Sequence, residues 1–186
     1  MKNRIEIKKL ALIVTLFMFG LQGLMAQVSF SHAAGGKVFI GSGEGFEYSS
    51  FGILYSPRLN FVEIGDSSTL SLGTHLGLGF QGSYNSRDGG ESSSFVFDVP
   101  VVVEFNFGQA SNNDNDDGFG FYAGAGYGIH KSSDFGESFS GPVASAGLRF
   151  AIADRPLDVN LSYQMGTGDF KDFAILGIGA QYCFGL

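Results

Sequence analysis

Alternation of apolar and polar residues is clearest between Phe95 and Phe107, in the run FVFDVPVVVEFNF. Every odd position of this run holds Phe or Val, whereas the even positions include Asp98, Glu104 and Asn106. A period of two places the bulky apolar groups on one face of an extended strand. The run is long for a strand of a soluble protein, but it fits a strand that crosses a bilayer at a tilt, which needs roughly 9–11 residues plus margins.

The same alternation recurs along the chain and predicts eight strands, an even number as bacterial single-chain barrels have. The turns after the second and sixth strands are short, and the loop 109–118 after the fourth is long for its side of the barrel. We therefore predict an all-β fold, an eight-stranded antiparallel up-and-down transmembrane β-barrel. The expected strands are Gly36–Ser42, Ser50–Ile64, Thr69–Tyr84, Phe95–Phe107, Phe119–His130, Ser140–Ala153, Leu157–Met165 and Phe173–Leu186.

Residues 1–26 differ from the rest of the chain. A basic start is followed by an apolar run from Leu10 to Phe19 and by a small residue, Ala26. This order is typical of a cleaved signal peptide, and the apolar run is shorter than the ~20 residues that a retained membrane helix needs. The barrel is then expected over residues 27–186. Cleavage would remove four basic residues and one acidic residue and change the net charge from −7 to −10, which excludes nucleic acid as a partner.

The orientation of the two strand faces separates a membrane barrel from a soluble, lipocalin-like ligand-binding barrel. The polar face is rich in Gly and Ser and poor in Lys and Glu, so it suits a crowded interior better than water. Eight strands leave an interior that side chains just fill, and the bulky apolar rows would overfill it. We expect these rows to face lipid, with tyrosines near strand ends forming an aromatic girdle: Tyr55, Tyr84, Tyr127 and Tyr163.

Five charged residues fall on the polar face and are expected to point into the barrel. They are Arg58, Asp98, Glu104, Arg149 and Asp158. Charges in a low-dielectric interior must pair or stay hydrated. We predict that these residues form a structural network that fills the lumen. Glu104 and Arg149 are the expected pair, since each lies at a similar distance from the turn that follows it.

Two short motifs have ordinary structural interpretations. Gly77–Gly82 matches G-x-G-x-x-G but lies within a predicted strand, with no helix after it to bind a phosphate. Asn113–Gly118 (NDNDDG) is similar to a calcium loop, yet Gly124 stands where the bidentate Glu belongs, so a solvated acidic loop is favoured. The single Cys183 excludes an internal disulfide. No metal ion and no cofactor is expected.

Candidate catalytic side chains also occur on the polar face. His75 and His130 are expected to point inward, together with Ser71, Ser83 and Glu104. A Ser, His and acid within hydrogen-bond reach at the lipid-accessible rim would make a lipid-modifying hydrolase or acyltransferase. No G-x-S-x-G motif supports this alternative, and the prediction is that the chain is not an enzyme.

Three segments resemble small bacterial outer-membrane β-barrels, the porin-like family that includes eight-stranded barrels of the OmpA/OmpX type. Phe97–Gly108 resembles that family's strand of the form aromatic–acidic–apolar–Pro–apolar run–aromatic–Gly, and Gly120–Gly128 is similar to the segment that follows it. Tyr182-Cys183-Phe184 resembles the terminal signal for the barrel-assembly machinery, although Leu186 replaces the usual final aromatic residue.

The resemblance implies a cell outer-membrane location, with lipid and lipopolysaccharide around the barrel and the assembly machinery as a partner during biogenesis. It implies no shared activity. A structural, anchoring or surface-interaction role with a filled, non-conducting lumen is the expectation. The partner of the acidic loops is left open.

Overall fold

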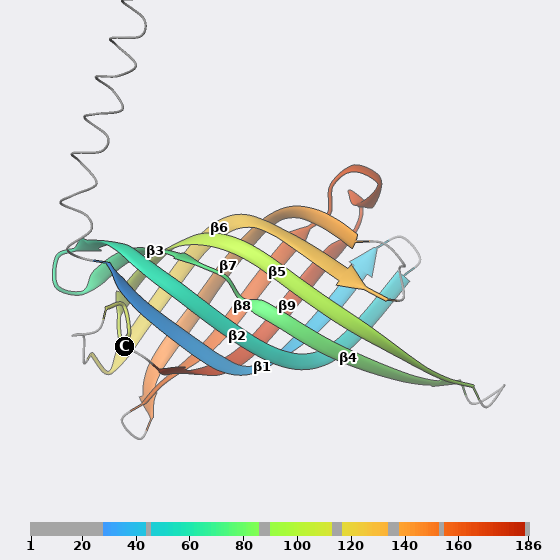
Figure 1. Ribbon diagram of the computed structural model, residues 1–186, viewed down its shortest axis with the longest axis horizontal. Helices are drawn as coiled ribbons and strands as arrows, with labels where there is room; N and C mark the ends of the chain where they lie inside the picture. Colours follow the sequence, from blue (N-terminus) through green and yellow to red (C-terminus); the bar gives the residue numbers. More distant parts are fainter. Residues whose placement is uncertain are drawn as a thin grey trace, which may run out of the picture.

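The computed structural model describes residues 28–43, 46–85, 90–112, 117–133, 138–152 and 155–184. The predicted signal peptide, residues 1–26, lies outside them. Nearly all of the described chain is extended, and one short 3-10 helix, η2 (Gly168–Phe170), precedes the last strand (Figure 1). The strands are β1 (Ser29–Gly43), β2 (Phe46–Ile64), β3 (Ser68–Gly73), β4 (Leu76–Asn85), β5 (Gly90–Gly108), β6 (Phe119–Ser132), β7 (Ser138–Ile152), β8 (Arg155–Met165) and β9 (Ala174–Phe184).

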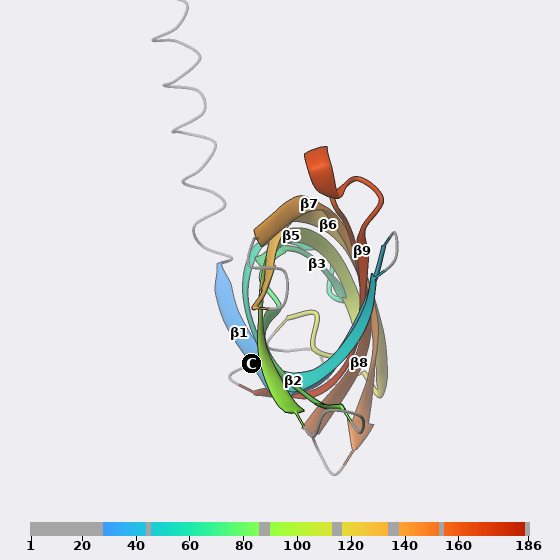
Figure 2. The same cartoon turned by 90° about the vertical axis from the view of Figure 1, so that its right-hand side faces the viewer.

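These strands form a closed antiparallel ring, which Figure 2 shows from one end. Strands that follow each other in the chain pair with each other, except that β3 and β4 both pair with β2 on one side and β5 on the other. β1 also pairs with β9, with His32 opposite Phe184. Closure gives the strand backbone hydrogen-bond partners within the wall, as a bilayer requires. We call the end of the barrel where β1 begins and β9 finishes the terminal end, and the opposite end the far end.

The expected third strand, Thr69–Tyr84, is present but interrupted. Thr74 and His75 separate β3 from β4, and both segments lie between β2 and β5. The amide of Thr74 still donates to the carbonyl oxygen of Pro57 at 3.2 Å, so the wall stays closed across the break. The chain therefore runs between the two ends of the barrel eight times, and the predicted eight-stranded barrel is confirmed.

The first strand is longer than predicted. It begins at Ser29 rather than Gly36, so residues 29–35 also belong to the wall. Its lumen-facing positions in this part are small (Ser31, Ala33 and Gly35), so the contrast between its faces is weak in the sequence.

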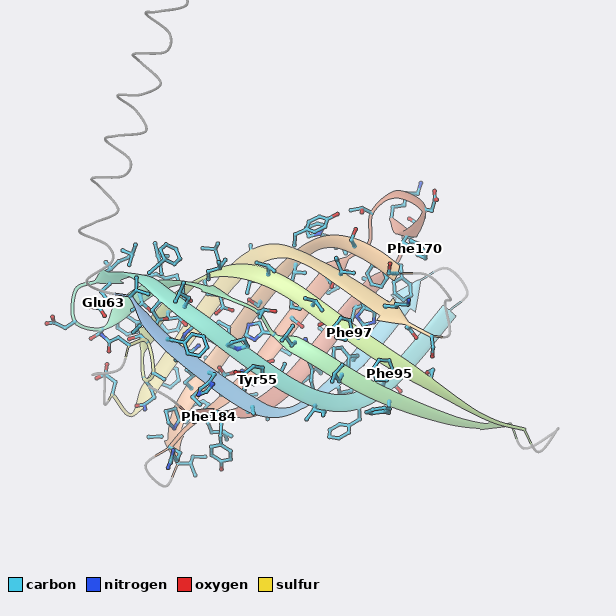
Figure 3. All side chains as sticks on the ribbon, viewed as in Figure 1. Tyr55, Glu63, Phe95, Phe97, Phe170 and Phe184 are labelled. Atoms are coloured by element: carbon cyan, nitrogen blue, oxygen red, sulfur yellow. The ribbon has the colours of Figure 1, made fainter. Side chains whose placement is uncertain are left out.

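Side chains alternate as predicted, with the apolar rows outside. In β5, Val103 is 49% exposed and Phe105 38%, whereas Glu104 between them is 1% exposed. The outer wall is covered with exposed Phe, Tyr, Leu, Ile and Val side chains, and Figure 3 shows side chains projecting from the ribbon on all sides. No helix in the described part of the chain is long and apolar enough to span a membrane.

The interior also holds an apolar cluster, which the alternation alone does not predict. Its buried members come from β1, β5, β7, β9 and the residue just before β9, and Phe170 of η2 packs against them at the far end (Figure 3). Glycine makes room for this cluster, because a Cβ atom at Gly77 would lie 2.3 Å from the ring of Phe39. The cluster consists of Phe39, Val96, Phe139, Phe173 and Ile175.

Candidate functional site

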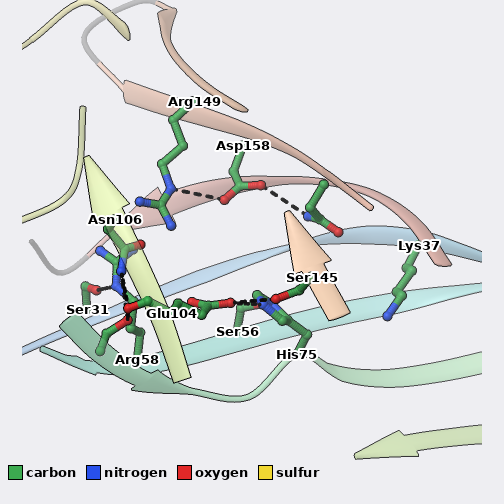
Figure 4. A network of polar contacts seen from close by, with 12 residues as sticks. Ser31, Lys37, Ser56, Arg58, His75, Glu104, Asn106, Ser145, Arg149 and Asp158 are labelled. Atoms are coloured by element: carbon green, nitrogen blue, oxygen red, sulfur yellow. Dashed lines mark hydrogen bonds and ion pairs between the residues drawn. The ribbon is translucent and has the colours of Figure 1, made fainter. Parts of the chain in front are cut away.

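The lumen contains a set of buried charged side chains. Three are basic and three acidic, so the set is neutral when the two buried histidines are neutral. A low-dielectric interior tolerates ions only when each has a partner or several hydrogen bonds. Figure 4 shows most of them at close range. The set comprises Lys37, Arg58, Arg149, Asp98, Glu104 and Asp158, with His75 and His130.

Arg149 of β7 pairs with Asp158 of β8. These residues lie opposite each other in the β7–β8 register, and Arg149 Nε is 3.2 Å from Asp158 Oδ2. Asn160 Nδ2 donates to the other carboxylate oxygen at 3.2 Å. The guanidinium carbon of Arg149 also lies 4.4 Å from the centre of the Tyr122 ring. Asn160 and Tyr122 thus help to hold this ion pair in place.

Arg58 of β2 is buried and hydrogen-bonded to neutral acceptors. Its Nε donates to Ser31 Oγ at 3.0 Å, and its Nη1 donates to Asn106 Oδ1 at 2.7 Å. Its Nη2 donates to the backbone carbonyl oxygen of Ala110. The guanidinium therefore connects β1, β5 and the loop after β5.

Glu104 of β5 accepts hydrogen bonds from two directions. Its Oε1 lies 2.7 Å from His75 Nε2 and 3.2 Å from Ser145 Oγ. On the other side of the imidazole ring, His75 Nδ1 lies 2.9 Å from Ser56 Oγ. The break between β3 and β4 brings the ring of His75 into the lumen between β2 and β5 (Figure 4).

Asp98 of β5 is shared by two basic side chains. Lys37 Nζ lies 3.2 Å from Asp98 Oδ2, and His130 Nδ1 lies 3.0 Å from Asp98 Oδ1. His130 also contacts the rings of Phe39 and Phe139 of the apolar cluster. This second ionic group therefore lies against the apolar cluster that fills the far end.

The loop after β5 turns back into the barrel at the terminal end. Residues 109–112 are buried, and Ala110 and Ser111 have no exposed surface. The carbonyl oxygen of Ala110 accepts hydrogen bonds from both Arg58 and Arg149, and that of Ser111 accepts one from Thr69 Oγ1 at 2.7 Å. Gly108 and Ala110 have positive φ angles of 71° and 57°, which direct the chain inward. We call residues 109–112 the plug.

The structure places all five predicted interior residues in the lumen, but it pairs them differently from the sequence prediction. The expected pair between Glu104 and Arg149 is wrong, because Glu104 bonds to His75 while Arg149 bonds to Asp158. Lys37 was missed although it lies within the expected strand Gly36–Ser42, on the same buried face as Phe39. The plug was missed too, although the unusual length of the loop 109–118 was its signal.

Ser56, His75 and Glu104 form a chain of hydrogen bonds of the kind that a hydrolase uses, but its placement is different. In Ser-His-acid triads the serine faces Nε2 and the acid faces Nδ1. Here the order is reversed, and the cavity beside the three side chains has a volume of only about 20 Å³, room for about one water molecule. The three side chains line the lumen rather than the lipid-facing rim. Ser71, one of the serines expected to point inward, instead accepts a hydrogen bond from Asn106 Nδ2. The side chain of Ser83 lies outside the described residues.

The calcium-like motif lies only partly within the described residues. Residues 113–116 of the calcium-like loop lie outside the described residues, and Gly124 lies in β6. Among the described residues, no cluster of three or more His, Cys, Asp and Glu side chains is arranged to hold a metal.

Comparison with known proteins gives matches in structure rather than in sequence. No protein-family model and no curated protein sequence matches the chain. The crystal structure of Ail, the attachment invasion locus protein of Yersinia pestis, in complex with the heparin analogue sucrose octasulfate, matches with a TM-score of 0.55 and 18% identity. The match covers 85% of this chain and 99% of that one. Neisserial surface protein A matches with a TM-score of 0.59 and 13% identity, over 86% of this chain and 99% of that chain. These likenesses confirm the fold as that of the small outer-membrane β-barrels.

Proposed function

We propose that the chain is an integral protein of the bacterial outer membrane with a structural, anchoring or surface-interaction role, and that its lumen does not conduct. In this proposal the terminal end faces the periplasm and the far end faces the outside. The orientation follows from an exported chain with an even number of crossings, which leaves both termini on the side from which the barrel is assembled.

The outer wall carries this proposal. Large apolar side chains are exposed along the wall, for example Phe51 at 67%, Ile53 at 61% and Phe80 at 62%. A soluble protein rarely exposes a continuous apolar surface of this extent, because each exposed side chain loses the free energy of burial. The soluble, lipocalin-like alternative requires the opposite orientation and is not supported by this wall.

A filled lumen supports the non-conducting role. From the terminal end to the far end it contains the plug, the Arg149–Asp158 and Glu104–His75 groups, the Lys37–Asp98–His130 group and the apolar cluster. Eight strands enclose a space that side chains can fill completely. Solute flow would have to break several ion pairs and displace buried aromatic rings.

A surface partner, if the far-end loops bind one, should be basic. The heparin analogue in the Ail structure is a polyanion. With a net charge of −10 after cleavage, this chain would repel such a ligand, and complementary charge favours a cationic partner.

Fractionation of a Gram-negative host that expresses the full chain tests the proposal. We expect the protein in the outer-membrane fraction after a carbonate wash, and we expect its gel mobility to change on boiling, as it does for folded barrels. The purified protein should give no stable single-channel steps in a planar bilayer. Protein that stays in the soluble fraction without detergent would contradict the membrane role, and regular conductance steps would contradict the filled lumen.

A further inference from the structure

The outer wall has a groove at its terminal end. The groove has a volume of about 380 Å³ and lies against β7, β8 and β9. Its lining combines one cation with apolar and aromatic side chains, which is unusual for a wall that otherwise faces hydrocarbon. The lining residues are Ile152, Arg155, Tyr182, Cys183 and Phe184.

Arg155 is the charged group of this groove. It is the first residue of β8 and lies opposite Ile152 of β7. Its side chain is exposed and has no hydrogen bond or ion pair with any described residue, in contrast to Arg58 and Arg149 in the lumen. An arginine on an apolar membrane surface is stabilised by an anion, and its planar fork matches the geometry of a phosphate group.

Aromatic side chains beside the groove place it at the depth of lipid headgroups. Phe184, which Figure 3 shows near the terminal end, lies opposite His32 of β1, and their ring centres are 4.2 Å apart. His32 Nδ1 lies 3.2 Å from the hydroxyl of Tyr55. Tyr182 lies half-exposed in β9. Amphipathic rings of this kind concentrate where the hydrocarbon meets the headgroups.

We propose that this groove binds an anionic phospholipid of the periplasm-facing leaflet. In this proposal Arg155 binds the phosphate, the hydroxyl of Tyr182 donates a second hydrogen bond to it, and Ile152 and Phe184 pack against the glycerol and the first acyl carbons. The inference rests on the proposed membrane location. It adds to that location a lipid class and a position on the wall.

Native mass spectrometry of the detergent-purified full chain tests the proposal with defined lipids. The probes are phosphatidylglycerol, phosphatidylcholine and diacylglycerol with identical acyl chains. We expect phosphatidylglycerol to be retained most strongly and diacylglycerol least. Arg155→Gln should reduce phosphatidylglycerol retention by about fivefold, which corresponds to about 1 kcal/mol for one basic residue at an anionic membrane surface. Arg155→Lys should give an intermediate loss, since it keeps the positive charge but lacks the planar guanidinium that can donate two parallel hydrogen bonds to a phosphate.

Lys131→Gln is the matched control. Lys131 is also an exposed basic residue, but it lies at the far-end finish of β6, so its replacement should leave retention unchanged. Equal losses for the two variants, equal retention of all three lipids, or full displacement by millimolar inorganic phosphate would overturn the proposal. Each variant is first checked for its heat-dependent gel shift. A wild-type chain that shifts on boiling but shows no lipid preference refutes the groove alone, whereas a chain found in the soluble fraction refutes the membrane role.

Discussion

The guanidinium of Arg58 donates a hydrogen bond to the backbone carbonyl oxygen of Ala110, and so connects the barrel wall to the plug that occupies its terminal end. A second hydrogen bond from Arg149 reaches the same oxygen at 3.3 Å. Arg58 of β2 and Arg149 of β7 therefore hold the same peptide group of the plug between opposite sides of the barrel. These hydrogen bonds join the plug to the buried charged residues of the lumen.

Replacing Arg58 should destabilise the barrel. Arg58→Gln removes the bond to Ala110 and leaves acceptors in the lumen without a donor, and it also leaves the buried set with an excess negative charge. We expect the free energy of unfolding to fall by about 3 kcal/mol, measured by urea titration with the gel shift as readout. Arg155→Gln, at an exposed position, should change it by less than about 0.5 kcal/mol. Equal effects of the two variants would show that the plug is not held by Arg58.

Replacing Glu104 tests the group formed with His75. Glu104→Ala leaves His75 and Ser145 without their acceptor inside the lumen, so we expect a loss of about 3 kcal/mol and a lower thermal unfolding midpoint. Circular dichroism of the detergent-solubilised barrel measures it. In a cycle with His75→Ala, the second substitution should cost much less in the Glu104→Ala background. An unchanged midpoint for Glu104→Ala would argue against a structural network.

Gly77 should tolerate no larger side chain while Phe39 is present. Gly77→Ala places a Cβ atom 2.3 Å from the Phe39 ring, so we expect a loss of about 1–3 kcal/mol from overpacking. Phe39→Leu in the same chain should recover part of this loss. Gly118→Ala is the control, because the added carbon would meet no atom of the described residues within 4 Å apart from its neighbours in the chain. Equal stability of the two glycine variants would contradict the close packing at the far end.

The hydrogen-bonded chain of Ser56, His75 and Glu104 should have no hydrolytic activity. The cavity beside it has room for about one water molecule, so a lipid ester cannot reach Ser56. We expect the mass spectrum of lipid A to be unchanged when the wild-type chain is overexpressed, and Ser56→Ala to give the same spectrum. A mass shift that disappears in Ser56→Ala would establish the enzyme instead.

The strands were predictable because one face of each carries bulky apolar residues. The expected strand Phe95–Phe107 lies within β5, and its alternation matches the exposure of Val103, Glu104 and Phe105. The start of β1 was not predictable in the same way. The lumen-facing positions of this segment are the small residues Ser, Ala and Gly, which fit a crowded interior. The hydrophobicity of the sequence therefore does not alternate strongly there.

The interior contacts were only partly predictable. The alternation of apolar and polar positions along each strand predicts which side chains point into the lumen, namely Arg58, Asp98, Glu104, Arg149 and Asp158. Pairing requires their depths in the barrel, which depend on the stagger between strands. The register places Arg149 opposite Asp158, a neighbour across one turn, whereas the partner of Glu104 enters through the break at His75. Neither the break nor the plug has a periodic signal in the sequence.

Because β1 pairs with β9, the barrel cannot close until its last strand is in place. The last 11-residue strand completes the ring, so a chain truncated before it would carry two open edges into the bilayer, where unpaired amides and carbonyls have no solvent to bind. The ring can therefore close only when β9 is present. Conversely, β1 begins and β9 ends on the same rim, with His32 opposite Phe184. Joining residue 184 to residue 29 with a short linker and opening the chain at a far-end loop should therefore yield a permuted protein with the same architecture.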